Sequence, residues 1–496
     1  MSRRIKDVVS EYFINVWHVN PEDTCQIEYV DARQFLKPQR IDLICKLLYI
    51  DSYVNGDSNP FARELYKEHL RSFTRGNFTE DGTEEKNSFQ KYIDTFNSLI
   101  DTCSRDGFSD DISVVPVGSD GNILDGSHRT SIAIYFNLQL PIVRIPDVTV
   151  KYDYEFFQER QLNQLYLDYM AYEYVNRLSD VFSLCLWPVA DSVPMLEKVD
   201  SLVASYAEVI YKKRVKLTYD GVNQIVIHTY AHHDWIGDYK DGYSGSVGKT
   251  NNCFKAGKYT TVYFLAGISL DEVLKLKSEI RNLYQLDKHA VHITDNKDET
   301  MTLARIFLND NSIKLINYGS PLKYSHFLDM FFEYRSALLS SSSNPDNYII
   351  DTGAAMAIWG LRDTSDIDYV TSGEDELPKM TDCESHEVAD NAYGAPISSI
   401  LFDPRNYLFY RDVKFLALDR VLYRKIRRKA KKDRGDVRLI RRFKFFKLNM
   451  FSAAKEKILF VCEKNYILRK VVGLVRRVNR RIKMLFRKLF YSQGGK

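Results

Sequence analysis

From about residue 213, short apolar runs typical of strands alternate with longer amphipathic runs typical of helices. The strand-like runs are "NQIVIHTY", "TTVYFLAG", "AVHIT" and "SIKLINYG". The helical ones are "SLDEVLKLKSEIRNLYQL", with Ser269 near its N-terminal cap, and "DNKDETMTLARIFLN". Such alternation favours a parallel sheet covered by helices. We therefore expect a central parallel-sheet α/β unit within an α/β and α+β multidomain protein.

The chain has 496 residues, which is too long for a single hydrophobic core. The segment "SSSSNPDN" (340–347) has the composition of a linker, and a further α/β unit begins after it at "YIIDTGAAMAIWG". Earlier, "ISVVPVGSDGNILDGSHR" predicts a strand, an Asp-Gly turn, a short strand and a helix start. We expect five parts: a domain with a helical N-terminal extension (1–150), a helical connector (151–212), an α/β domain (213–339), a second α/β unit (345–440) and a basic amphipathic helical tail (441–496).

The cysteines argue against two classes of protein. All seven are scattered and none forms a CxxC pair, so neither a disulfide framework nor a thiolate zinc site is expected. The basic N-terminus has no continuous apolar segment, because Asp7 and Glu11 interrupt it, and no run approaches the length of a membrane span. We expect a cytoplasmic protein.

The charge is unevenly distributed along the chain. Residues 421–496 contain 26 Lys and Arg against four acidic residues, a balance of +22, whereas the rest has 43 basic and 62 acidic residues, a balance of −19. Apolar residues of the tail recur in steps of three and four at Leu468, Val471, Val472, Val475, Val478, Ile482, Leu485, Phe486 and Leu489. This pattern predicts a basic amphipathic helix that binds an anionic membrane surface at the inner face of the membrane. A helix packed on the acidic body and a nucleic-acid-binding arm are the alternatives.

The stretch "ILDGSHRTSIAIYF" (123–136) places Gly126, His128 and Arg129 at a helix start, where phosphate binds well. Residues around it, "FNSLIDTCSRDGFSDDISVVPVGSDGNILDGSHRTSIAIYFNLQLPIVRI", resemble the ParB/sulfiredoxin-like fold over about 50 residues. The resemblance implies binding of a nucleoside triphosphate, and a kinase activity in some members. It gives Gly126, Ser127, His128 and Arg129 contacts to phosphate, and gives Asp125 a catalytic role, holding Mg²⁺ or orienting the acceptor. The alternative is a surface turn in which Asp125 caps the helix and Arg129 is solvated.

A second motif is "TGAAMAIWGLRDTSDIDYV". Alternation on a strand puts Asp366 and Asp368 on one face, where two carboxylates can share divalent metals. The pattern resembles the nucleotidyltransferase superfamily, in which a Gly-Gly or Gly-Ser pair is followed by D-h-D-h, and "RRKAKKDRGDVRLI" is similar to the helix that follows there. The resemblance implies Mg²⁺ on Asp366 and Asp368 and a nucleotide phosphate at Gly353. Ala354 departs from the pattern.

The third carboxylate of such a site has two candidates. Asp403 and Asp419 come after apolar runs, and neither lies cleanly between two apolar residues of a strand. We name Asp403 as the metal ligand. An inactive nucleotidyltransferase-like domain is the alternative.

Two further segments carry polar side chains. "HTYAHHDWIGD" holds His228, His232, His233, Asp234 and Trp235, for which a sugar-binding loop is a better hypothesis than a metal site. His292, Thr294 and Asp295 end a strand at a helix start, where ligands bind in open sheets, although Asp295 could simply cap the helix. "GYSGSVGKT" (242–250) lacks the first glycine of a P-loop and is expected to be a flexible loop.

Residues 200–440 resemble proteins encoded in bacterial capsule and lipopolysaccharide gene clusters. The resulting hypothesis is a transferase of phosphorus-containing groups, a kinase or nucleotidyltransferase or both, that acts in surface polysaccharide biosynthesis. It would use Mg²⁺, ATP or another nucleoside triphosphate, and a sugar or sugar-phosphate acceptor. The alternatives are a ParB-like DNA-binding partition protein and a nucleotidyltransferase toxin that modifies tRNA. Nucleic acid is the less favoured partner, because no helix-turn-helix pattern follows the "DGSHR" segment.

Overall fold

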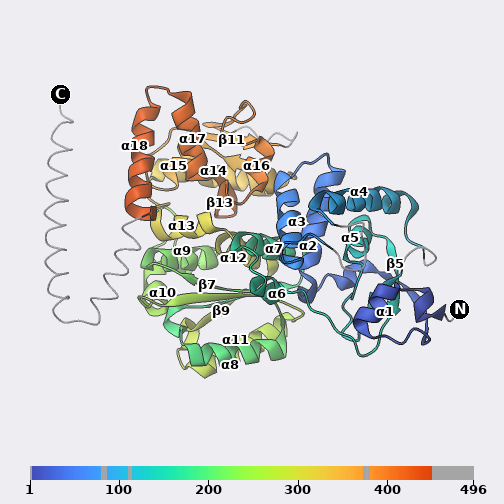
Figure 1. The fold of residues 1–496 in the computed structure, drawn as a ribbon. Coiled ribbons are helices and arrows are strands. Elements are labelled where there is room, and N and C mark those ends of the chain that lie inside the picture. The colour runs from blue at the N-terminus through green and yellow to red at the C-terminus, as the bar shows by residue number, and fades with distance from the viewer. Residues whose placement is uncertain (1–2, 80–86, 110–113, 373–376, 378–379, 450–496) are drawn as a thin grey trace, which may run out of the picture. The chain divides into compact units, whose positions relative to one another are not determined.

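The computed structural model describes residues 3–449 except 80–86, 110–113, 373–376 and 378–379. The chain divides into two compact units, Met1–Arg424 and Lys425–Lys496. The described residues form a mixed α/β structure with three main sheets, all in the first unit (Figure 1). The multidomain α/β class expected from the sequence is therefore confirmed at this level.

The N-terminal part is built on a three-stranded sheet in the order β3-β5-β4. β3 (Ile27–Asp31) is antiparallel to β5 (Gln139–Arg144), and β4 (Val115–Val117) is parallel to β5. Helix α5 (Ser127–Phe136) begins where the sequence predicts, after the Asp-Gly turn. The expected short strand is reduced to a single bridge between Val117 and Ile123.

Helices pack around this sheet and bury a core rich in aromatic side chains. They are α1 (Glu11–Trp17), α2 (Asp42–Val54), α3 (Pro60–Phe73), α4 (Phe89–Asp106) and α5. The two-residue strands β1 (Arg3–Arg4) and β2 (Thr24–Cys25) pair beside them. Among the described residues every cysteine is free.

The expected helical connector is only partly helical. Helices α6 (Tyr154–Glu159), α7 (Gln164–Arg177) and α8 (Val193–Tyr206) form as expected. However, β6 (Val181–Leu186) lies between α7 and α8, and β7 (Glu208–Lys216) follows α8. Both strands belong to the sheet of the next region. The fully buried strand β6 pairs with β8 and β9, and β7 pairs with β8.

The central sheet has the order β7-β8-β6-β9, and every neighbouring pair in it is antiparallel. The prediction of a parallel sheet is therefore wrong. Its remaining strands are β8 (Tyr259–Ala266) and β9 (Val291–Ile293), both at predicted positions. Helices α8 and α11 (Leu270–Tyr284) cover one face, and α9 (Tyr219–Tyr230) and α12 (Lys297–Phe307) lie towards the other (Figure 1). Ser269 and Glu272 form a capping box at the start of α11.

Two segments expected as strands are helices, which explains the error in topology. "NQIVIHTY" lies in α9 and "SIKLINYG" lies in α13 (Asp310–Tyr318). The side chain of Thr218 caps α9 and that of Asn309 caps α13, which fixes their helical starts. Since most of α9 is buried, its sequence is apolar on nearly every side and carries little helical periodicity.

The last sheet of the first unit is mixed, in the order β12-β11-β10-β14-β13. Its strands are β10 (Tyr348–Ile350), β11 (Ile367–Thr371), β12 (Cys383–Ser385), β13 (Tyr407–Tyr410) and β14 (Val413–Leu416). Its associated helices are α14 (Ser325–Ser340), α15 (Thr352–Ala357), α16 (Ile397–Phe402) and α17 (Leu418–Arg428). Strand β10 is antiparallel to β11 and parallel to β14.

The turn between β13 and β14 reaches the central region. The backbone amide of Arg411 donates to His228 Nε2 at 3.3 Å, and Asp412 forms ion pairs with Arg305 and Arg335 at 3.1 Å each. Burial of Asp412 is outweighed by these two guanidinium groups, which lower the pKa of its carboxyl to about 2. The segments on either side of the expected linker 340–347 are therefore joined by polar contacts within one unit.

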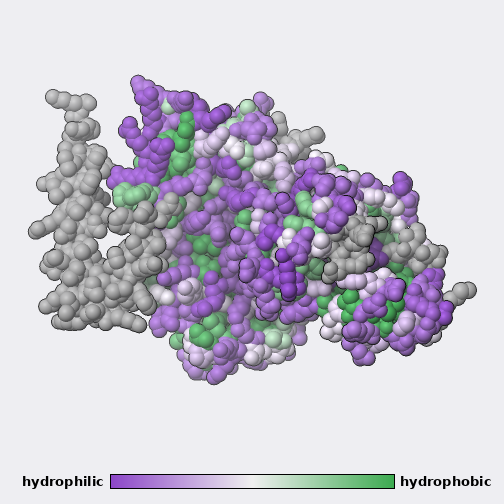
Figure 2. All heavy atoms as spheres, in the orientation of Figure 1, coloured by the Kyte–Doolittle hydropathy of each residue, from purple (hydrophilic) through white to green (hydrophobic). Residues whose placement is uncertain are grey.

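The second unit begins at Lys425 and includes α18 (Asp433–Phe443) and η8 (Lys444–Asn449). Lys425 is buried and pairs with Asp436 at 2.7 Å and with Asp433 at 3.4 Å. The predicted amphipathic helix around 468–489 lies outside the described residues. No helix within the described ranges is both long and apolar enough to cross a bilayer. On the face drawn in Figure 2 most of the described surface is hydrophilic, with scattered hydrophobic patches.

Candidate functional site

Asp351 is an acid at the end of a buried strand. It directly follows β10 and precedes α15, and its side chain is 0% exposed. Its backbone amide donates to the carbonyl oxygen of Asp368 at 2.9 Å, which extends the antiparallel pairing of β10 with β11. The sheet therefore brings a second carboxylate to Asp368 from a neighbouring strand.

Asp368 is the second residue of β11 and is half-buried. Its pKa is raised by burial first, and then by the negative charges of Asp351 and Asp366. Asp366 stands just before β11, is exposed, and accepts a hydrogen bond from Thr364 Oγ1 at 3.1 Å. The two acids named from the sequence thus share one neighbourhood with Asp351, and the excess of negative charge there suits a bound cation.

Three further side chains surround Asp351. His386 follows β12 and places Nδ1 3.3 Å from Asp351 Oδ2, while the phenol of Tyr393 donates to the same oxygen. Arg424 lies 3.7 Å from Asp351 Oδ2 through Nη1, and its Nη2 donates to His386 Nε2 at 2.9 Å. The contact with Asp351 is the largest cause that raises the pKa of His386.

The geometry of this group fits a divalent cation. Among the described residues, Asp351, Asp368 and His386 each offer one ligand atom, and these atoms lie within 4.8 Å of one another. We call these three residues the acid cluster. Asp351 Oδ1 is buried and has no hydrogen-bond partner, which is costly for a carboxylate oxygen. The two carboxylates fit Mg²⁺, which prefers oxygen ligands, whereas both nitrogens of His386 already face Asp351 and Arg424.

Close packing against Thr364 explains why a glycine occupies position 353. A Cβ at this position would stand 2.6 Å from Thr364 Oγ1, so only glycine lets the start of α15 lie against that threonine. Thr364 in turn holds Asp366, as described above. The phosphate contact expected of Gly353 stays a prediction.

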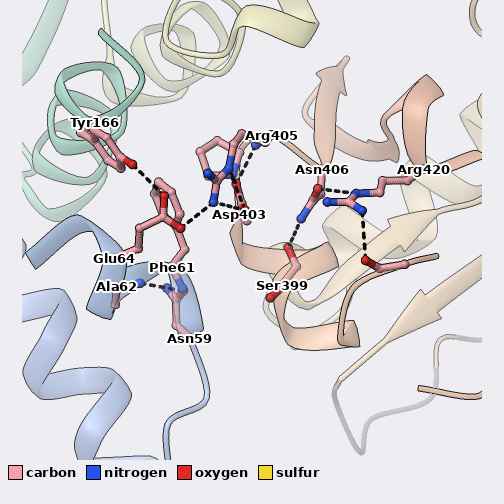
Figure 3. Close-up of polar contacts among 12 residues, drawn as sticks. Asn59, Phe61, Ala62, Glu64, Tyr166, Ser399, Asp403, Arg405, Asn406 and Arg420 are labelled. Atoms are coloured by element: carbon pink, nitrogen blue, oxygen red, sulfur yellow. Dashed lines mark hydrogen bonds and ion pairs between the residues drawn. The ribbon is translucent and has the colours of Figure 1, made fainter. Parts of the chain in front are cut away.

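Asp403, the expected third carboxylate, belongs to a different group. It ends α16 and accepts from Arg405 Nε at 2.8 Å and from Arg405 Nη2 at 2.7 Å. Arg405 Nη2 also donates to Glu64 of α3 at 2.7 Å, and Tyr166 donates to Glu64 at 2.7 Å (Figure 3). Asp403 is therefore engaged in an ion-pair network and is absent from the acid cluster. Asp419 lies in the first turn of α17, also outside that cluster.

The "DGSHR" segment forms a tight turn before α5. Gly126 has φ = +78°, and a Cβ there would lie 2.9 Å from Val115 Cγ2, so the position requires glycine. Asp125 is exposed and its Oδ1 accepts from the backbone amide of Gly126 at 2.6 Å. Ser127 opens the helix as its first residue.

His128 and Arg129 make contacts with their own protein. The Tyr66 hydroxyl lies 2.7 Å from His128 Nε2, and the ring of Phe96 packs edge-on against the imidazole. Arg129 Nη1 donates to the carbonyl oxygen of Val114 at 3.3 Å, and Nη2 is 3.6 Å from Asp125. The segment thus has the predicted turn-helix geometry, and its binding of phosphate stays a prediction.

A cleft of about 710 Å³ collects most of the other predicted residues. His233, Trp235, His292 and Asp295 all line it, although they come from two segments some 60 residues apart. His232 also lines it. Asp234, which is exposed in η5 (Asp234–Ile236), is not part of the lining, and neither are His228 and Thr294. We call this cavity the β9 cleft, since His292 is the central residue of β9.

Sequence reasoning missed Asp351, His386, Tyr393 and Arg424. One signal for Asp351 was present: an acid directly after the apolar triplet "YII" and just before the Gly-Ala pair. Such an acid lies at the end of a buried strand, where burial of a carboxylate is costly unless a partner or a ligand compensates its charge. The other three lie in loops or helices far along the chain and carry no comparable local signal.

Comparisons with protein-family profiles, with curated proteins and with solved structures find no match for this chain.

Proposed function

We propose that the chain is a phosphate-transfer enzyme that transfers a nucleotidyl or related phosphate-linked group at the acid cluster. The observation that carries the proposal is the juxtaposition of Asp351 and Asp368 from adjacent strands, with ligand atoms within 4.8 Å. Two carboxylates so placed, one of them with a buried unpartnered oxygen, have the donor set for a divalent cation on a triphosphate.

Asp351 and Asp368 would hold Mg²⁺ through their carboxylate oxygens. When bound, Mg²⁺ supplies charge compensation for the triphosphate and for the leaving pyrophosphate. Asp366, exposed beside Asp368, extends the negative surface on which the cation would sit.

The protein's own side chains hold Asp351 in place. Tyr393, His386 and Arg424 all approach Asp351 Oδ2, which leaves Oδ1 for a ligand. We assign these three residues a positioning role, because their polar atoms contact Asp351 or one another.

The wider context is also a proposal. We infer a role in bacterial surface polysaccharide biosynthesis, with ATP or another nucleoside triphosphate as donor and a sugar or sugar-phosphate as acceptor. Its support is the resemblance of residues 200–440 to proteins of capsule and lipopolysaccharide gene clusters.

Peripheral attachment to the inner face of a membrane is proposed from the basic C-terminal region. Within the described part of the second unit, Phe445 and Phe446 are 48% and 53% exposed beside the exposed Arg441 and Arg442. Exposed aromatic side chains next to cations suit an anionic lipid surface. Because the amphipathic helix predicted from the sequence of the tail carries the apolar face that would enter the lipid surface, deletion of residues 450–496 should release the protein from anionic vesicles at low salt. Equal sedimentation of both forms with those vesicles would contradict the attachment.

The enzymatic proposal is tested by pyrophosphate release from nucleoside triphosphates in the presence of Mg²⁺ and candidate sugar-phosphate acceptors. Asp351→Asn and Asp368→Asn should abolish release, because each removes a carboxylate from the cation. Asp382→Asn is the matched control: Asp382 is exposed, stands just before β12, and has φ = +58°, which asparagine tolerates. If both cluster variants still release pyrophosphate, the acid cluster is not the active centre.

A further inference from the structure

We infer that the β9 cleft is a binding site for a nucleotide that carries a pyrophosphate group, separate from the acid cluster. The inference goes beyond the proposed transfer reaction and does not depend on it. It rests on the positive charges that line the cleft, on an aromatic surface at its rim, and on buried polar atoms that have no partner within the protein.

Four cationic side chains from three elements converge on the cleft: Lys249 of α10 (Ser246–Cys253), Lys277 and Arg281 of α11, and Lys288 of η6 (Asp287–His289). Two carboxylates, Asp295 and Glu299, also line it. Glu299 is used locally, since its side chain accepts from the Asp295 amide and from Asn296 at 3.1 Å each. The cleft therefore keeps an excess of positive charge that suits a pyrophosphate group.

The cations are incompletely compensated by the protein itself. Asp295 pairs with Lys277 at 3.3 Å, whereas Arg281 Nε is buried and has no hydrogen-bond partner. Burial, followed by the charges of Lys277, Lys249 and Arg281, lowers the pKa of His292 well below its usual range. An anion bound among these cations would complete their hydrogen bonds and relieve their mutual repulsion.

An aromatic surface lies at the same cleft. Trp235 is 49% exposed, and its ring centroid is 5.4 Å from that of Tyr230, which also lines the cavity. Half-exposed aromatic rings offer a flat face on which a nucleobase can stack. A volume of about 710 Å³ is within the range of cavities that hold ligands of nucleotide size.

Two residues that line the cleft each have a buried polar atom without a hydrogen-bond partner. His292 is 5% exposed, and its Nε2 has no hydrogen-bond partner, while the Tyr230 hydroxyl lies 3.2 Å from its Nδ1. Thr229 is also 5% exposed, and its Oγ1 has no partner. Because an unpartnered buried polar atom is costly, both atoms are suited to a bound ligand with several oxygens.

Nucleotide binding in the cleft is measured by quenching of tryptophan fluorescence in the full-length protein. The probes are UDP and ADP, with uridine and adenosine as the matching nucleosides without phosphate. EDTA is present throughout, so that binding through Mg²⁺ at the acid cluster is removed. At least one nucleotide should bind, and its signal should be lost in Trp235→Phe. The matching nucleoside should bind at least about tenfold more weakly.

Two substitutions remove cations of the cleft, and a third is their control. Arg281→Gln and Lys288→Gln should each weaken nucleotide binding by about tenfold or more. Lys288 is exposed, so its replacement leaves the core intact. Lys275→Gln should have no effect, since Lys275 is exposed on the same helix, α11, but does not line the cleft. Asp368→Asn should also bind the nucleotide normally, which separates this result from the fate of the proposed transfer reaction.

The inference is overturned if neither nucleotide binds in EDTA, if both cation variants keep wild-type affinity, or if the nucleoside binds as tightly as the nucleotide. Persistence of the full quenching signal in Trp235→Phe would also overturn it, because the ligand would then lie elsewhere.

Discussion

Asp351, directly after β10, and Asp368, on the antiparallel strand β11, are joined by a hydrogen bond from the amide of Asp351 to the carbonyl oxygen of Asp368 at 2.9 Å. Their carboxylates share a site in which one oxygen of Asp351 has no partner. The backbone pairing that builds the sheet therefore also brings two carboxylates together.

Asp368→Asn should stabilise the protein slightly in the absence of divalent cations. Because burial, Asp351 and Asp366 raise the pKa of Asp368, its carboxyl favours folding when protonated, and this contribution is lost as the pH rises through the folded-state pKa. At pH 7.5 in EDTA we expect a rise in Tm of roughly 1–2 °C, small because Asp368 is half-exposed. Differential scanning calorimetry measures it.

The same variant should lose the increase in Tm that Mg²⁺ gives the wild type, since ligand binding stabilises the state that binds it. Asp382→Asn is the control and should keep that increase. A Tm for Asp368→Asn below that of the wild type in EDTA would show that the carboxylate has a favourable partner in the protein instead.

His386 should give the protein a pH-dependent stability near neutrality. Asp351 raises the pKa of His386 in the folded state, so the contribution is fully present below the unfolded pKa and is lost as the pH rises through the folded value. The urea midpoint of the wild type should therefore fall between about pH 6.5 and pH 8.5 by more than that of His386→Gln. His326→Gln, at an exposed histidine of α14, should follow the wild type. Parallel pH profiles for wild type and His386→Gln would contradict the assigned contact.

Asp403→Asn should reduce stability and leave the response to Mg²⁺ unchanged. Asp403 is 7% exposed, and its carboxylate accepts from Arg405 at 2.7 and 2.8 Å. Loss of this charge-assisted pair should lower the free energy of unfolding by about 1–3 kcal/mol, measured by urea denaturation. If Asp403→Asn instead abolished the stabilisation by Mg²⁺, a ligand role for Asp403 would be restored.

Gly126→Ala should be more destabilising than Gly56→Ala. Both glycines have positive φ, +78° and +70°, so both variants incur the cost of a left-handed alanine, about 1 kcal/mol. Only at Gly126 would the new Cβ also meet atoms closer than 3.0 Å, among them Val115 Cγ2 on buried β4. We expect an additional loss of about 1–3 kcal/mol in the free energy of unfolding. Equal losses of unfolding free energy in the two variants would show that the turn at Gly126 accommodates the new Cβ without strain.

Arg129→Ala tests the phosphate site predicted at the "DGSHR" turn. If Arg129 holds phosphate, the variant should lose about 1.5–3 kcal/mol of binding free energy for a nucleoside triphosphate, measured by calorimetric titration. Arg144→Ala is a suitable control, because Arg144 is exposed on β5 and pairs with Glu28. Unchanged affinity in Arg129→Ala would show that the residue has a structural role, through its contacts with the Val114 carbonyl and Asp125.

The success of sequence reasoning differed between elements for local reasons. The cap at Ser269 was predicted because a capping box involves only residues within one helical turn, here Ser269 and Glu272. Strand β6 was missed because "VFSLCL" begins only three residues after a long helix, and the short Leu-Ser-Asp break at 178–180 was not taken as the end of the helical region. Helix α9 was mistaken for a strand because its burial on nearly all sides removed the helical period from its sequence.

For the acid cluster, the sequence by itself determined the position of Asp366 and Asp368 around the start of a strand, since alternation depends only on neighbouring residues. The tertiary structure decided which groups join Asp368. Antiparallel pairing of β10 with β11 brought Asp351 to it, and pairing of β11 with β12 brought His386. The same long-range packing took Asp403 to Arg405 and Glu64 instead. Local patterns such as strand alternation depend on residues close together in the sequence. Strand order and ion-pair partners depend instead on distant segments that meet only when the whole unit folds.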